Sequence, residues 1–287
     1  MNTKVAIIGG GPGGVFCSIY LKRFGIDSIV FEKKEIGGLI RYANLIENFP
    51  FLKPISGPDF CDMIKKEVEL NKIIVIFETV KKINFKNKFV VTTGKNEYFS
   101  DYLILATGTE PVIIKEAKNI KKDMLNFWEN FFHIKNKEVA IIGGGDVAFD
   151  NAINLSKRKN KVTVIYRGLR CLNILKERCA KDKNINLIGP AEIKKILKKN
   201  GKYEIIFKQK NEEKNYSFDC VISACGRKEY YGGIKNIDKI ISYRNLKEKL
   251  FLCGDVKNGR FRQAINSISD AMKIAMRIKE LEYEGKS

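Results

Sequence analysis

The pattern of apolar residues along the chain predicts a βαβ unit at its N-terminal end. Val5–Ile8 is a continuous apolar run, which is typical of a strand buried in a parallel sheet. The glycine-rich turn Gly9–Gly14 follows, and then a helix that runs to about Phe24 with Gly25 as its C′ residue. A second strand is expected at Asp27–Phe31. Strand, turn, helix and strand therefore occur in the order of a βαβ unit.

The same pattern occurs again near the middle of the chain. The strand Glu138–Ile142 leads into the turn Gly143–Ala148, a helix that runs to about Lys157, and a strand at Lys161–Ile165. Two such units predict an α/β fold with two Rossmann-like dinucleotide-binding domains, each of the three-layer ββα type.

Apolar segments outside these units predict further strands and one long helix. Ile73–Val91 is rich in β-branched and aromatic residues, which indicates hairpin strands. Tyr102–Leu105 predicts a buried strand that ends at Ala106–Gly108. Three more strands are expected at Tyr203–Lys208, Phe218–Ala224 and Leu250–Leu252. The final helix, from Gln263 to about Ile278, has an apolar face that consists of Ala264, Ile265, Ile268, Ala271, Met272, Ala275 and Met276.

Each piece of the first unit suits a dinucleotide. The pattern Gly9-x-Gly11-x-x-Gly14 permits a tight turn in which backbone N–H groups approach a pyrophosphate, and the helix N-terminus adds its dipole. Glu32 ends the second strand, where a carboxylate can bind ribose hydroxyls. A glycine pattern alone is weak evidence, but here strand, turn, helix, strand and acid all have the right spacing.

The second unit differs at the position that contacts the ribose. Ala148 takes the third glycine position, which close packing of helix and strand permits. No carboxylate ends the second strand; Tyr166 stands there, followed by Arg167 and Arg170. Guanidinium groups suit a 2′-phosphate, so this unit is predicted to prefer NADP(H) to NAD(H). The alternative is that both arginines are merely solvated residues of a loop.

Two nucleotide-binding units predict two nucleotides, a fixed FAD and an exchangeable nicotinamide dinucleotide. The turn Thr109–Pro111 is expected to leave the first domain, and Tyr243–Lys249 to return to it. The predicted FAD-binding domain is therefore discontinuous, with residues 1–111 and 246–287, and residues 112–245 form the predicted NAD(P)H-binding domain.

Composition narrows the class of protein. Hydrophobic residues make up 44% and charged residues 30% of the 287 residues, which is ordinary for a soluble enzyme. No apolar run reaches the ~18 residues of a membrane span, and no signal peptide precedes Val5. We therefore expect a cytoplasmic protein that does not bind a membrane.

The formal charge of +20 predicts attraction to acidic partners. The alternative is a proteome-wide bias, because the basic residues are spread along the chain with only modest clusters at Lys194–Lys195 and Lys198–Lys199. Nucleic-acid binding would require clustered Arg and Lys with interleaved aromatics, so no nucleic acid is expected.

The cysteines and the single histidine, His133, give no metal-binding pattern. Seven cysteines form an odd count, and no two of them make a Cys-x-x-Cys. We therefore expect no metal, and unpaired thiols that act as small hydrophobic residues in a reducing compartment.

Ordered segments of the chain resemble the two-dinucleotide-binding flavoproteins and, within them, the low-molecular-weight thioredoxin reductases. The segments are Gly9–Gly14, Gly37–Leu39, Glu47–Pro50, Ala106–Gly108, Gly143–Ala148, Gly226, Gly254–Val256 and Arg262–Ala264, and they span nearly the whole chain. The resemblance implies that Gly254 and Asp255 contact the ribityl and phosphate region of FAD and that Asn48 lies beside the flavin. It also implies a helix opened by Arg262–Ala264 whose N-terminus stabilises negative charge on the flavin.

This resemblance implies two sets of cofactor-binding residues and a homodimer. The expected FAD site consists of Gly9, Gly11, Gly14, Glu32, Gly38, Leu39, Asn48, Val80, Ala106, Thr107, Gly108, Gly254, Asp255, Arg262, Gln263 and Ala264. The expected NADP site consists of Gly143, Gly145, Asp146, Ala148, Arg167, Arg170 and Gly226.

The chain departs from the family where the redox-active disulfide belongs. Typical members carry Cys-x-x-Cys-Asp before the second glycine turn. Counting back from Gly143 without gaps, the two cysteine positions fall on Asn126 and Glu129, and the general-acid position falls on Asn130. A carboxamide and a carboxylate cannot form the dithiol that takes electrons from a flavin, so the catalytic residues are left unassigned.

Other cysteine pairs are poor substitutes. Cys220 and Cys225 lie on one predicted strand, where an offset of five puts them on opposite faces. Cys171 and Cys179 can meet only through a loop whose geometry the sequence does not give. A disulfide reductase that uses such a non-standard pair is the third hypothesis.

The leading hypothesis is an FAD-dependent oxidoreductase that passes electrons between NAD(P)H and an external acceptor, either a ferredoxin- or flavodoxin-like protein or a small molecule. Cysteine-free members of the family include ferredoxin–NADP reductases, whose acidic partner suits the positive charge. Phe127 or Trp128 is a candidate aromatic cover for the flavin, or both pack the domain junction. His133 is either a proton shuttle near the flavin or a linker residue.

The second hypothesis is an FAD-binding protein with impaired NADPH use. Such a protein would be reduced by a partner such as ferredoxin or act non-enzymatically. It is favoured by the segment Tyr166–Arg170, which is shorter and one arginine poorer than the family's 2′-phosphate motif.

Overall fold

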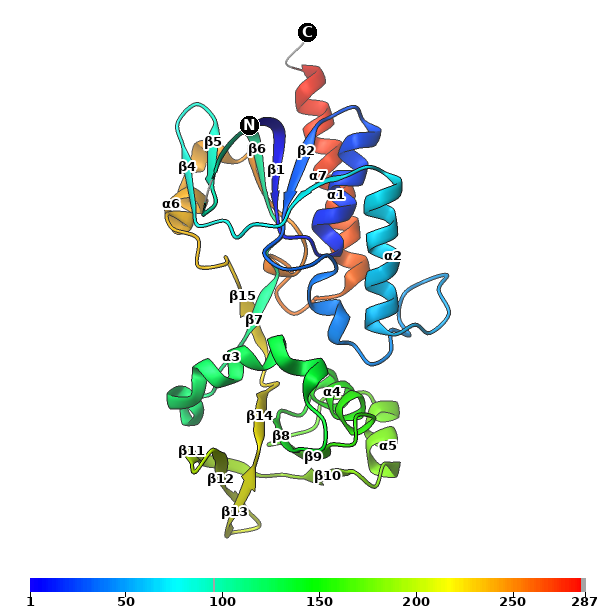
Figure 1. The fold of residues 1–287 in the computed structure, drawn as a ribbon, viewed down its shortest axis with the longest axis vertical. Coiled ribbons are helices and arrows are strands. Elements are labelled where there is room, and N and C mark those ends of the chain that lie inside the picture. The colour runs from blue at the N-terminus through cyan, green and yellow to red at the C-terminus, as the bar shows by residue number, and fades with distance from the viewer. Residues whose placement is uncertain (95, 285–287) are drawn as a thin grey trace. The chain divides into compact units, whose positions relative to one another are not determined.

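The computed structural model describes residues 1–94 and 96–284, although the side chains at positions 125, 126, 128, 129 and 244 are not described. The chain divides into two units (Figure 1). Unit 1 consists of Met1–Arg41, Ile46–Glu110 and the chain from Lys228 onward, and unit 2 consists of Tyr42–Leu45 and Pro111–Arg227.

A mixed sheet with the order β3-β2-β1-β6-β5-β4 forms the centre of unit 1, and β16 also pairs with β6. The strands are β1 Asn2–Ile8, β2 Ser28–Phe31, β3 Ile74–Ile76, β4 Lys82–Phe85, β5 Phe89–Thr92, β6 Glu97–Leu105 and β16 Leu250–Leu252. β1, β2, β3, β6 and β16 pair in parallel, whereas β4 and β5 form an antiparallel hairpin that joins the start of β6. The α-helices of unit 1 are α1 Pro12–Arg23, α2 Gly57–Leu70, α6 Ile237–Ser242 and α7 Ala264–Glu284.

The two faces of this sheet carry two separate cores. Val5 and Ile7 of β1 are buried in a cluster with residues of α1 and α7. Ala6 and Ile8 point the other way and are buried with residues of the β4–β5 hairpin and α6. Helices, parallel strands and hairpin therefore form the predicted three layers.

Gly25 is the C′ residue of α1, as predicted. It has φ +73°, and its N–H donates to the Lys22 carbonyl oxygen at 2.9 Å. The Ile26 N–H donates to the Leu21 carbonyl oxygen at 3.0 Å, which completes a Schellman-type end.

Unit 2 repeats the plan with a parallel sheet of order β10-β9-β8-β14 and an antiparallel sheet of order β11-β12-β13. Its strands are β8 Glu138–Ile142, β9 Lys161–Ile165, β10 Ile185–Ile188, β11 Glu192–Lys199, β12 Lys202–Gln209, β13 Glu212–Phe218 and β14 Cys220–Ser223. Its α-helices are α3 Lys121–Asn130, α4 Asp146–Ser156 and α5 Asn173–Lys181. One core lies among α3, α4 and α5, and the other lies under the antiparallel sheet.

Short elements complete the chain. The 3-10 helices are η1 Gly38–Tyr42, η2 Lys115–Ile120, η3 Phe131–His133, η4 Arg244–Leu246 and η5 Gly254–Val256. Where the chain passes between the units, β7 Thr109–Pro111 pairs with β15 Arg227–Glu229.

The return to unit 1 comes earlier than the predicted turn at Tyr243–Lys249. The units divide at Arg227 and Lys228, so residues 228–245 belong to unit 1 rather than to the second domain. The reason is packing: Ile234, Ile237 and Ile240 are buried in the core under β4 and β5.

Two strand predictions are also wrong. Ile73–Val91 is not one hairpin, because β3 pairs in parallel with β2 and only β4 and β5 form the hairpin. Phe218–Ala224 is two strands rather than one. Asp219 separates them, because its N–H donates to the Glu138 carbonyl oxygen at 2.8 Å and its carboxylate accepts from the Glu138 N–H at 2.8 Å.

The apolar face predicted for the last helix is rotated from the buried one. α7 buries Ser267, Asp270, Ala271, Ile274, Ala275 and Ile278. Ile265, Met272 and Met276 are 39%, 44% and 45% exposed. The difference arises because two polar residues have partners inside the unit, which apolar periodicity does not register.

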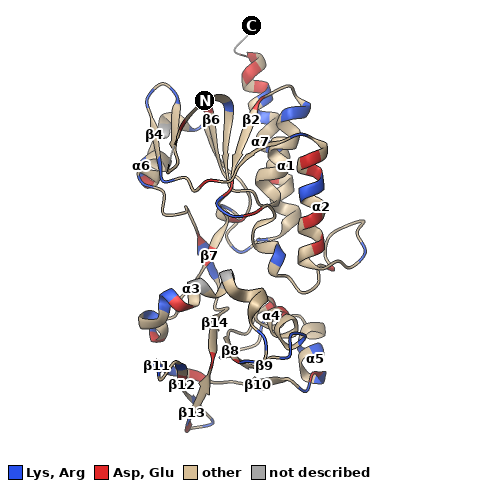
Figure 2. Ribbon diagram, viewed as in Figure 1, with Lys and Arg blue, Asp and Glu red and all other residues tan. Residues whose placement is uncertain are grey.

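Lysine and arginine are spread over the elements of both units (Figure 2). None of the helices formed by the described residues is long and apolar enough to span a membrane. Within the same residues, no group of three or more His, Cys, Asp or Glu side chains is arranged to hold a metal ion.

Candidate functional site

The turn between β1 and α1 is built so that side chains are excluded from its first and last glycine. Gly9 has φ +115°, and a Cβ there would lie 2.3 Å from the Ala106 carbonyl oxygen. A Cβ on Gly14 would lie 2.0 Å from the Gly9 carbonyl oxygen. At Gly11, by contrast, the described residues other than its own neighbours along the chain leave the Cβ position open. α1 begins at Pro12 without a side-chain cap, so its first N–H groups can bind an anion.

Glu32 joins the end of β2 to this turn. Its Oε2 accepts a hydrogen bond from the Gly10 N–H at 2.8 Å, and its Oε1 accepts one from the Lys34 N–H at 2.9 Å. The structure therefore brings the predicted carboxylate to the glycine turn. Each oxygen has a second lone pair, so Glu32 can also accept from a ribose hydroxyl.

The loop that carries Gly38 lies over the open part of the turn. Gly38 has φ +61°, and a Cβ there would lie 3.3 Å from the Gly11 Cα. Leu39 is 40% exposed. Arg41 holds this loop: it is 9% exposed and donates to the Gly38 carbonyl oxygen at 3.1 Å and to the Ile36 carbonyl oxygen at 2.6 Å. This role could not be predicted, because a single arginine after a loop is ordinarily solvated.

Thr107 supplies a buried polar atom that lacks a partner. It follows β6, where the Ala106 N–H donates to the Ile8 carbonyl oxygen at 2.8 Å. The Thr107 Oγ1 is buried, and it has no hydrogen-bond partner among the described residues. Gly108 comes next with φ +70° and open space at its Cβ position. A ligand that meets this hydroxyl would satisfy it, so Ala106–Gly108 fits a cofactor contact.

The start of α7 and the turn before it lie together. Gly254 has φ +75°, and its N–H donates to Asp270 Oδ2 at 3.2 Å. Arg262 Nε donates to the Asp255 carbonyl oxygen at 3.4 Å. Asp270 is only 7% exposed. Its role is not predicted by the sequence, where it lies among the apolar residues of the last helix. It positions the Gly254–Asp255 turn from within α7.

Asn48 and Gln263 are brought together from distant parts of the sequence. Asn48 Nδ2 donates to Gln263 Oε1 at 2.8 Å, directly before α7 begins at Ala264. Val80 is 5% exposed, and its side chain packs into the core under the hairpin. Only the backbone of Val80 is therefore suited to a cofactor contact.

The turn between β8 and α4 has the same construction. Gly143 has φ +149°, and a Cβ there would lie 2.3 Å from the Ala224 carbonyl oxygen. Around the Cβ position of Gly145, the described chain leaves open space. α4 begins at Asp146 without a side-chain cap, and Ala148 is fully buried.

The arginine segment after β9 folds back on this turn. The Arg170 N–H donates to the Gly144 carbonyl oxygen at 2.7 Å. Asp146 Oδ1 accepts from the Leu172 N–H at 2.8 Å, so this carboxylate holds the segment. The side chains of Arg167 and Arg170 are exposed. The chemistry of this donor set fits a phosphate group.

Gly226 comes shortly after β14. It has φ +115°, and its carbonyl oxygen accepts from the Val112 N–H at 2.9 Å. Burial raises the pKa of the neighbouring Cys225, and the positive charges of Arg167 and Arg170 oppose that shift.

The residues predicted to stand at the positions of the family's disulfide and general acid lie in α3. The side chains of Asn126, Trp128 and Glu129 lie outside the described residues, and Asn130 is exposed at the end of the helix. Phe127 is 6% exposed and packs edge-on against Phe131, with ring centroids 5.4 Å apart. The proposal of Phe127 as a flavin cover is therefore wrong, because its ring belongs to the core of unit 2. His133 is exposed in η3.

All seven thiols are free. Cys220 and Cys225 pack into cores on opposite faces of the sheet, as predicted, although Cys225 lies beyond the end of β14. Burial raises the pKa of Cys179 to about 12, and it also raises the pKa of Cys171. Burial therefore lowers the thiolate fraction of both cysteines, and the thiolate is the reactive form.

Comparisons with known proteins agree with this architecture. The family model "Pyridine nucleotide-disulphide oxidoreductase" matches residues 3–271. A thioredoxin reductase of Rickettsia prowazekii is 28% identical over 303 residues, covering 97% of this chain and 97% of that protein. A "34.2 kDa protein in rubredoxin operon" of Clostridium pasteurianum is 27% identical over 291 residues, covering 95% of this chain and 94% of that protein.

Solved structures share the fold. Thioredoxin reductase of Lactococcus lactis in its FR conformation has a TM-score of 0.84 at 22% identity, covering 98% of this chain and 99% of that chain. Thioredoxin reductase of T. acidophilum has a TM-score of 0.81 at 24% identity, with the same coverage.

Proposed function

Because the chain belongs to the pyridine nucleotide-disulphide oxidoreductase family, we propose that it is an FAD-dependent enzyme that passes electrons between NAD(P)H and an acceptor outside the chain. In this proposal unit 1 holds FAD and unit 2 holds the nicotinamide dinucleotide. The enzyme has no redox disulfide of its own.

The observation that carries the proposal is the repetition of one backbone cradle. In each unit a strand-end carbonyl oxygen, of Ala106 or Ala224, lies 2.3 Å from the place where a Cβ on Gly9 or Gly143 would stand. Each cradle opens onto an uncapped helix N-terminus. Such a cradle supports the binding of a pyrophosphate, and two of them support two dinucleotides.

Residues of unit 1 have separable roles in this proposal. FAD, when bound, supplies the hydride and electron chemistry. The α1 N-terminus and Gly11 bind the pyrophosphate, Glu32 accepts from a ribose, and the Thr107 hydroxyl contacts the cofactor. The hydrogen bond between Asn48 and Gln263 orients the start of α7, whose dipole favours negative charge there.

The absence of cysteine at the predicted disulfide positions supports the proposal of an electron acceptor outside the chain. The positions that form the disulfide in typical thioredoxin reductases are Asn126 and Glu129, which hold no sulfur. A disulfide reductase based on Cys171 and Cys179 is disfavoured, because burial raises both pKa values. The relative whose description places it in a rubredoxin operon favours a small electron-transfer protein as the acceptor.

The second candidate is an FAD-binding protein that is reduced by a protein partner rather than by NADPH. The short segment Tyr166–Arg170 favours it, because this segment is one arginine poorer than the family's 2′-phosphate motif. Its Arg170 N–H is also bonded to the Gly144 carbonyl oxygen of the glycine turn, where a nicotinamide dinucleotide would lie.

One experiment separates the candidates. The purified, FAD-loaded protein is mixed anaerobically with NADPH or NADH while the flavin absorbance is followed. Bleaching within seconds is expected for the proposed enzyme. An unchanged spectrum at millimolar NADPH, together with bleaching by reduced ferredoxin, would establish the second candidate instead.

A further inference from the structure

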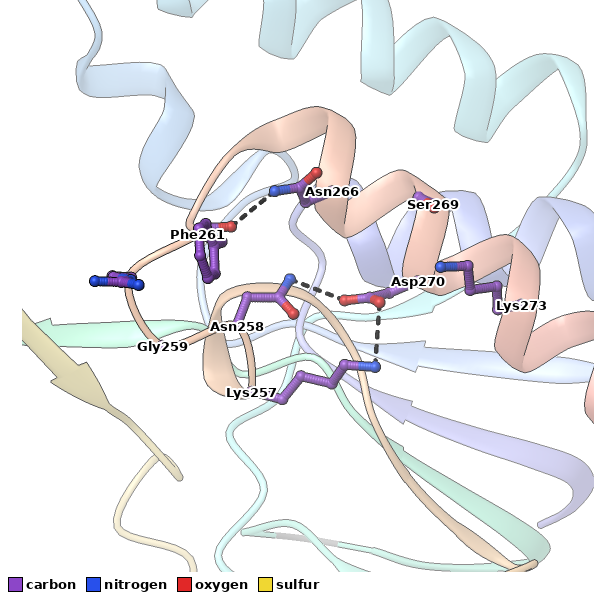
Figure 3. Close-up of a pocket in the computed structure, with 9 residues that line it drawn as sticks. Lys257, Asn258, Gly259, Phe261, Asn266, Ser269, Asp270 and Lys273 are labelled. Carbon is purple, nitrogen blue, oxygen red and sulfur yellow. Dashed lines mark hydrogen bonds and ion pairs between the residues drawn. The ribbon is translucent and has the colours of Figure 1, made fainter.

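A basic surface surrounds the loop that connects η5 to α7. Lys257, Asn258, Gly259, Arg260 and Phe261 of the loop border a cavity of about 560 Å³, together with residues of the first turns of α7 that include Lys273 (Figure 3). We call these residues the basic loop surface.

The charge of the basic loop surface is positive. Lys257, Arg260 and Lys273 line it, and Asp270 is the one carboxylate among the described residues of the lining. Asp270 is 7% exposed and already engaged, because it pairs with Lys257 Nζ at 3.1 Å and accepts from Asn258 Nδ2 at 2.9 Å (Figure 3). The outward field therefore comes from Arg260 and Lys273.

The loop is held in one shape by its own hydrogen bonds. The Lys257 N–H donates to the Gly254 carbonyl oxygen at 3.0 Å, and the Phe261 N–H donates to the Asn258 carbonyl oxygen at 2.8 Å. The Phe261 carbonyl oxygen accepts from Asn266 Nδ2 at 2.9 Å. A preorganised loop loses little conformational entropy when a partner binds it.

Phe261 gives the surface an apolar anchor. Its side chain is 65% exposed, and the Arg260 guanidinium carbon lies 5.2 Å from its ring centroid. An exposed aromatic ring beside an arginine is the composition of a protein–protein hot spot.

The loop connects two segments of the proposed FAD site. The loop begins after Gly254–Val256 and ends at Arg262–Ala264, and both segments belong to the FAD site in the function proposed above, on which this inference rests. A protein docked on the loop thus lies next to the cofactor.

We propose that the basic loop surface is the docking site of an acidic electron-transfer protein. Two partner molecules in turn each accept one electron, NADPH is oxidised to NADP⁺, and one proton goes to solvent. The oxidation of one NADPH therefore balances the reduction of two one-electron partners. Charge complementarity accelerates the encounter, and Phe261 lengthens the life of the complex.

The test uses the full-length, FAD-loaded protein and an acidic [2Fe–2S] ferredoxin as the probe. The protein is reduced with dithionite, excess reductant is removed, and electron transfer to oxidised ferredoxin is followed by stopped flow at several ionic strengths. Arg260→Glu with Lys273→Glu tests the charge, and Phe261→Ala tests the anchor. Matched controls are Lys86→Glu with Lys122→Glu, which changes the net charge equally, and Phe77→Ala, which removes another exposed ring.

The expected result is specific to the surface. At low ionic strength the Arg260/Lys273 double variant lowers the second-order rate constant at least ~10-fold, and the control pair lowers it by less than about 2-fold. Phe261→Ala raises the dissociation constant of the ferredoxin complex about 10-fold, whereas Phe77→Ala leaves it unchanged. Added salt removes most of the difference between the charge variants.

Two outcomes overturn the inference. Equal losses in the double variant and its control pair would assign the effect to net charge alone. A protein that is bleached by NADPH but passes no electrons to ferredoxin would retain its function towards NADPH and refute the docking site. Because the probe reaction starts from dithionite-reduced protein, a failure of NADPH to bleach the flavin is a separate result that refutes the proposed function.

Discussion

Removal of the unpaired Thr107 hydroxyl is expected to change the free energy of unfolding in opposite directions in the FAD-free protein and in the FAD complex. Its Oγ1 is buried, and the described residues offer it no hydrogen-bond partner. Thr107→Val keeps the shape of the side chain and removes the hydroxyl. If the hydroxyl contacts FAD, the substitution stabilises the cofactor-free protein and weakens FAD binding.

The magnitude follows from the cost of an unpaired polar group. A buried hydroxyl without a partner costs about 1–3 kcal/mol, so Thr107→Val is expected to raise the free energy of unfolding of the FAD-free protein by about 1 kcal/mol. In the FAD complex the same change removes a hydrogen bond. Because the two effects add in the binding free energy, the dissociation constant of FAD is expected to rise about 10-fold or more.

Ser100 provides a matched control. It lies on β6, is fully buried, and its Oγ also has no partner among the described residues. It is not among the residues expected to bind FAD. Ser100→Ala should therefore shift the free energy of unfolding by the same amount with and without FAD.

The assay is chemical unfolding of both variants and the parent protein, with FAD removed and with FAD saturating, together with a fluorescence titration of FAD. Thr107→Val is expected to raise the free energy of unfolding without FAD and to lower it with FAD saturating. A Thr107→Val variant that behaves like Ser100→Ala, with unchanged FAD affinity, would show that Thr107 does not contact the cofactor.

Three further predictions concern the nicotinamide site and the thiols. Arg167→Ala with Arg170→Ala should raise the KM for NADPH by about 10-fold or more and leave the KM for NADH unchanged. The reason is that only NADPH carries the 2′-phosphate that the guanidinium groups would bind. Equal effects on both KM values would refute this assignment. Cys171→Ser with Cys179→Ser should leave the rate of electron transfer from NADPH to ferredoxin unchanged, and a loss in the correctly folded variant would support the disulfide mechanism. Burial raises the pKa of Cys179 and Cys253 to about 12 from 9.0, so their stabilising contribution is complete below pH 9 and is lost above it. Each thiol is expected to lower the free energy of unfolding by about 1.4 kcal/mol per pH unit there, and Cys253→Ala should remove its share of that slope.

The features that could be predicted from the sequence are those that steric constraints within a few residues determine. Gly9 and Gly143 stand where the backbone has a positive φ and a carbonyl oxygen occupies the Cβ position. A side chain there would be strained and would clash, so the glycines, together with the apolar strand before each turn and the helix after it, locate both turns. The strands beside them are buried on both faces and therefore appear as continuous apolar runs.

The features that could not be predicted depend on contacts between distant segments. Asp270 and Arg41 are buried because they bond to backbone groups of loops, and nothing in their neighbours along the sequence marks them. β3 looked like one strand of a hairpin, because its apolar residues do not say which strand they pair with. The early return of the chain to unit 1 likewise depends on Ile234 and Ile237 finding a core far away in sequence.

The central claim is that the protein takes electrons from NAD(P)H onto FAD and holds no redox disulfide. An anaerobic titration with NADPH, followed by flavin absorbance and by counting reactive thiols in denaturant before and after, tests it directly. We expect complete bleaching at one NADPH per FAD with no change in the number of thiols. Bleaching that requires two NADPH per FAD and exposes two new thiols would contradict it.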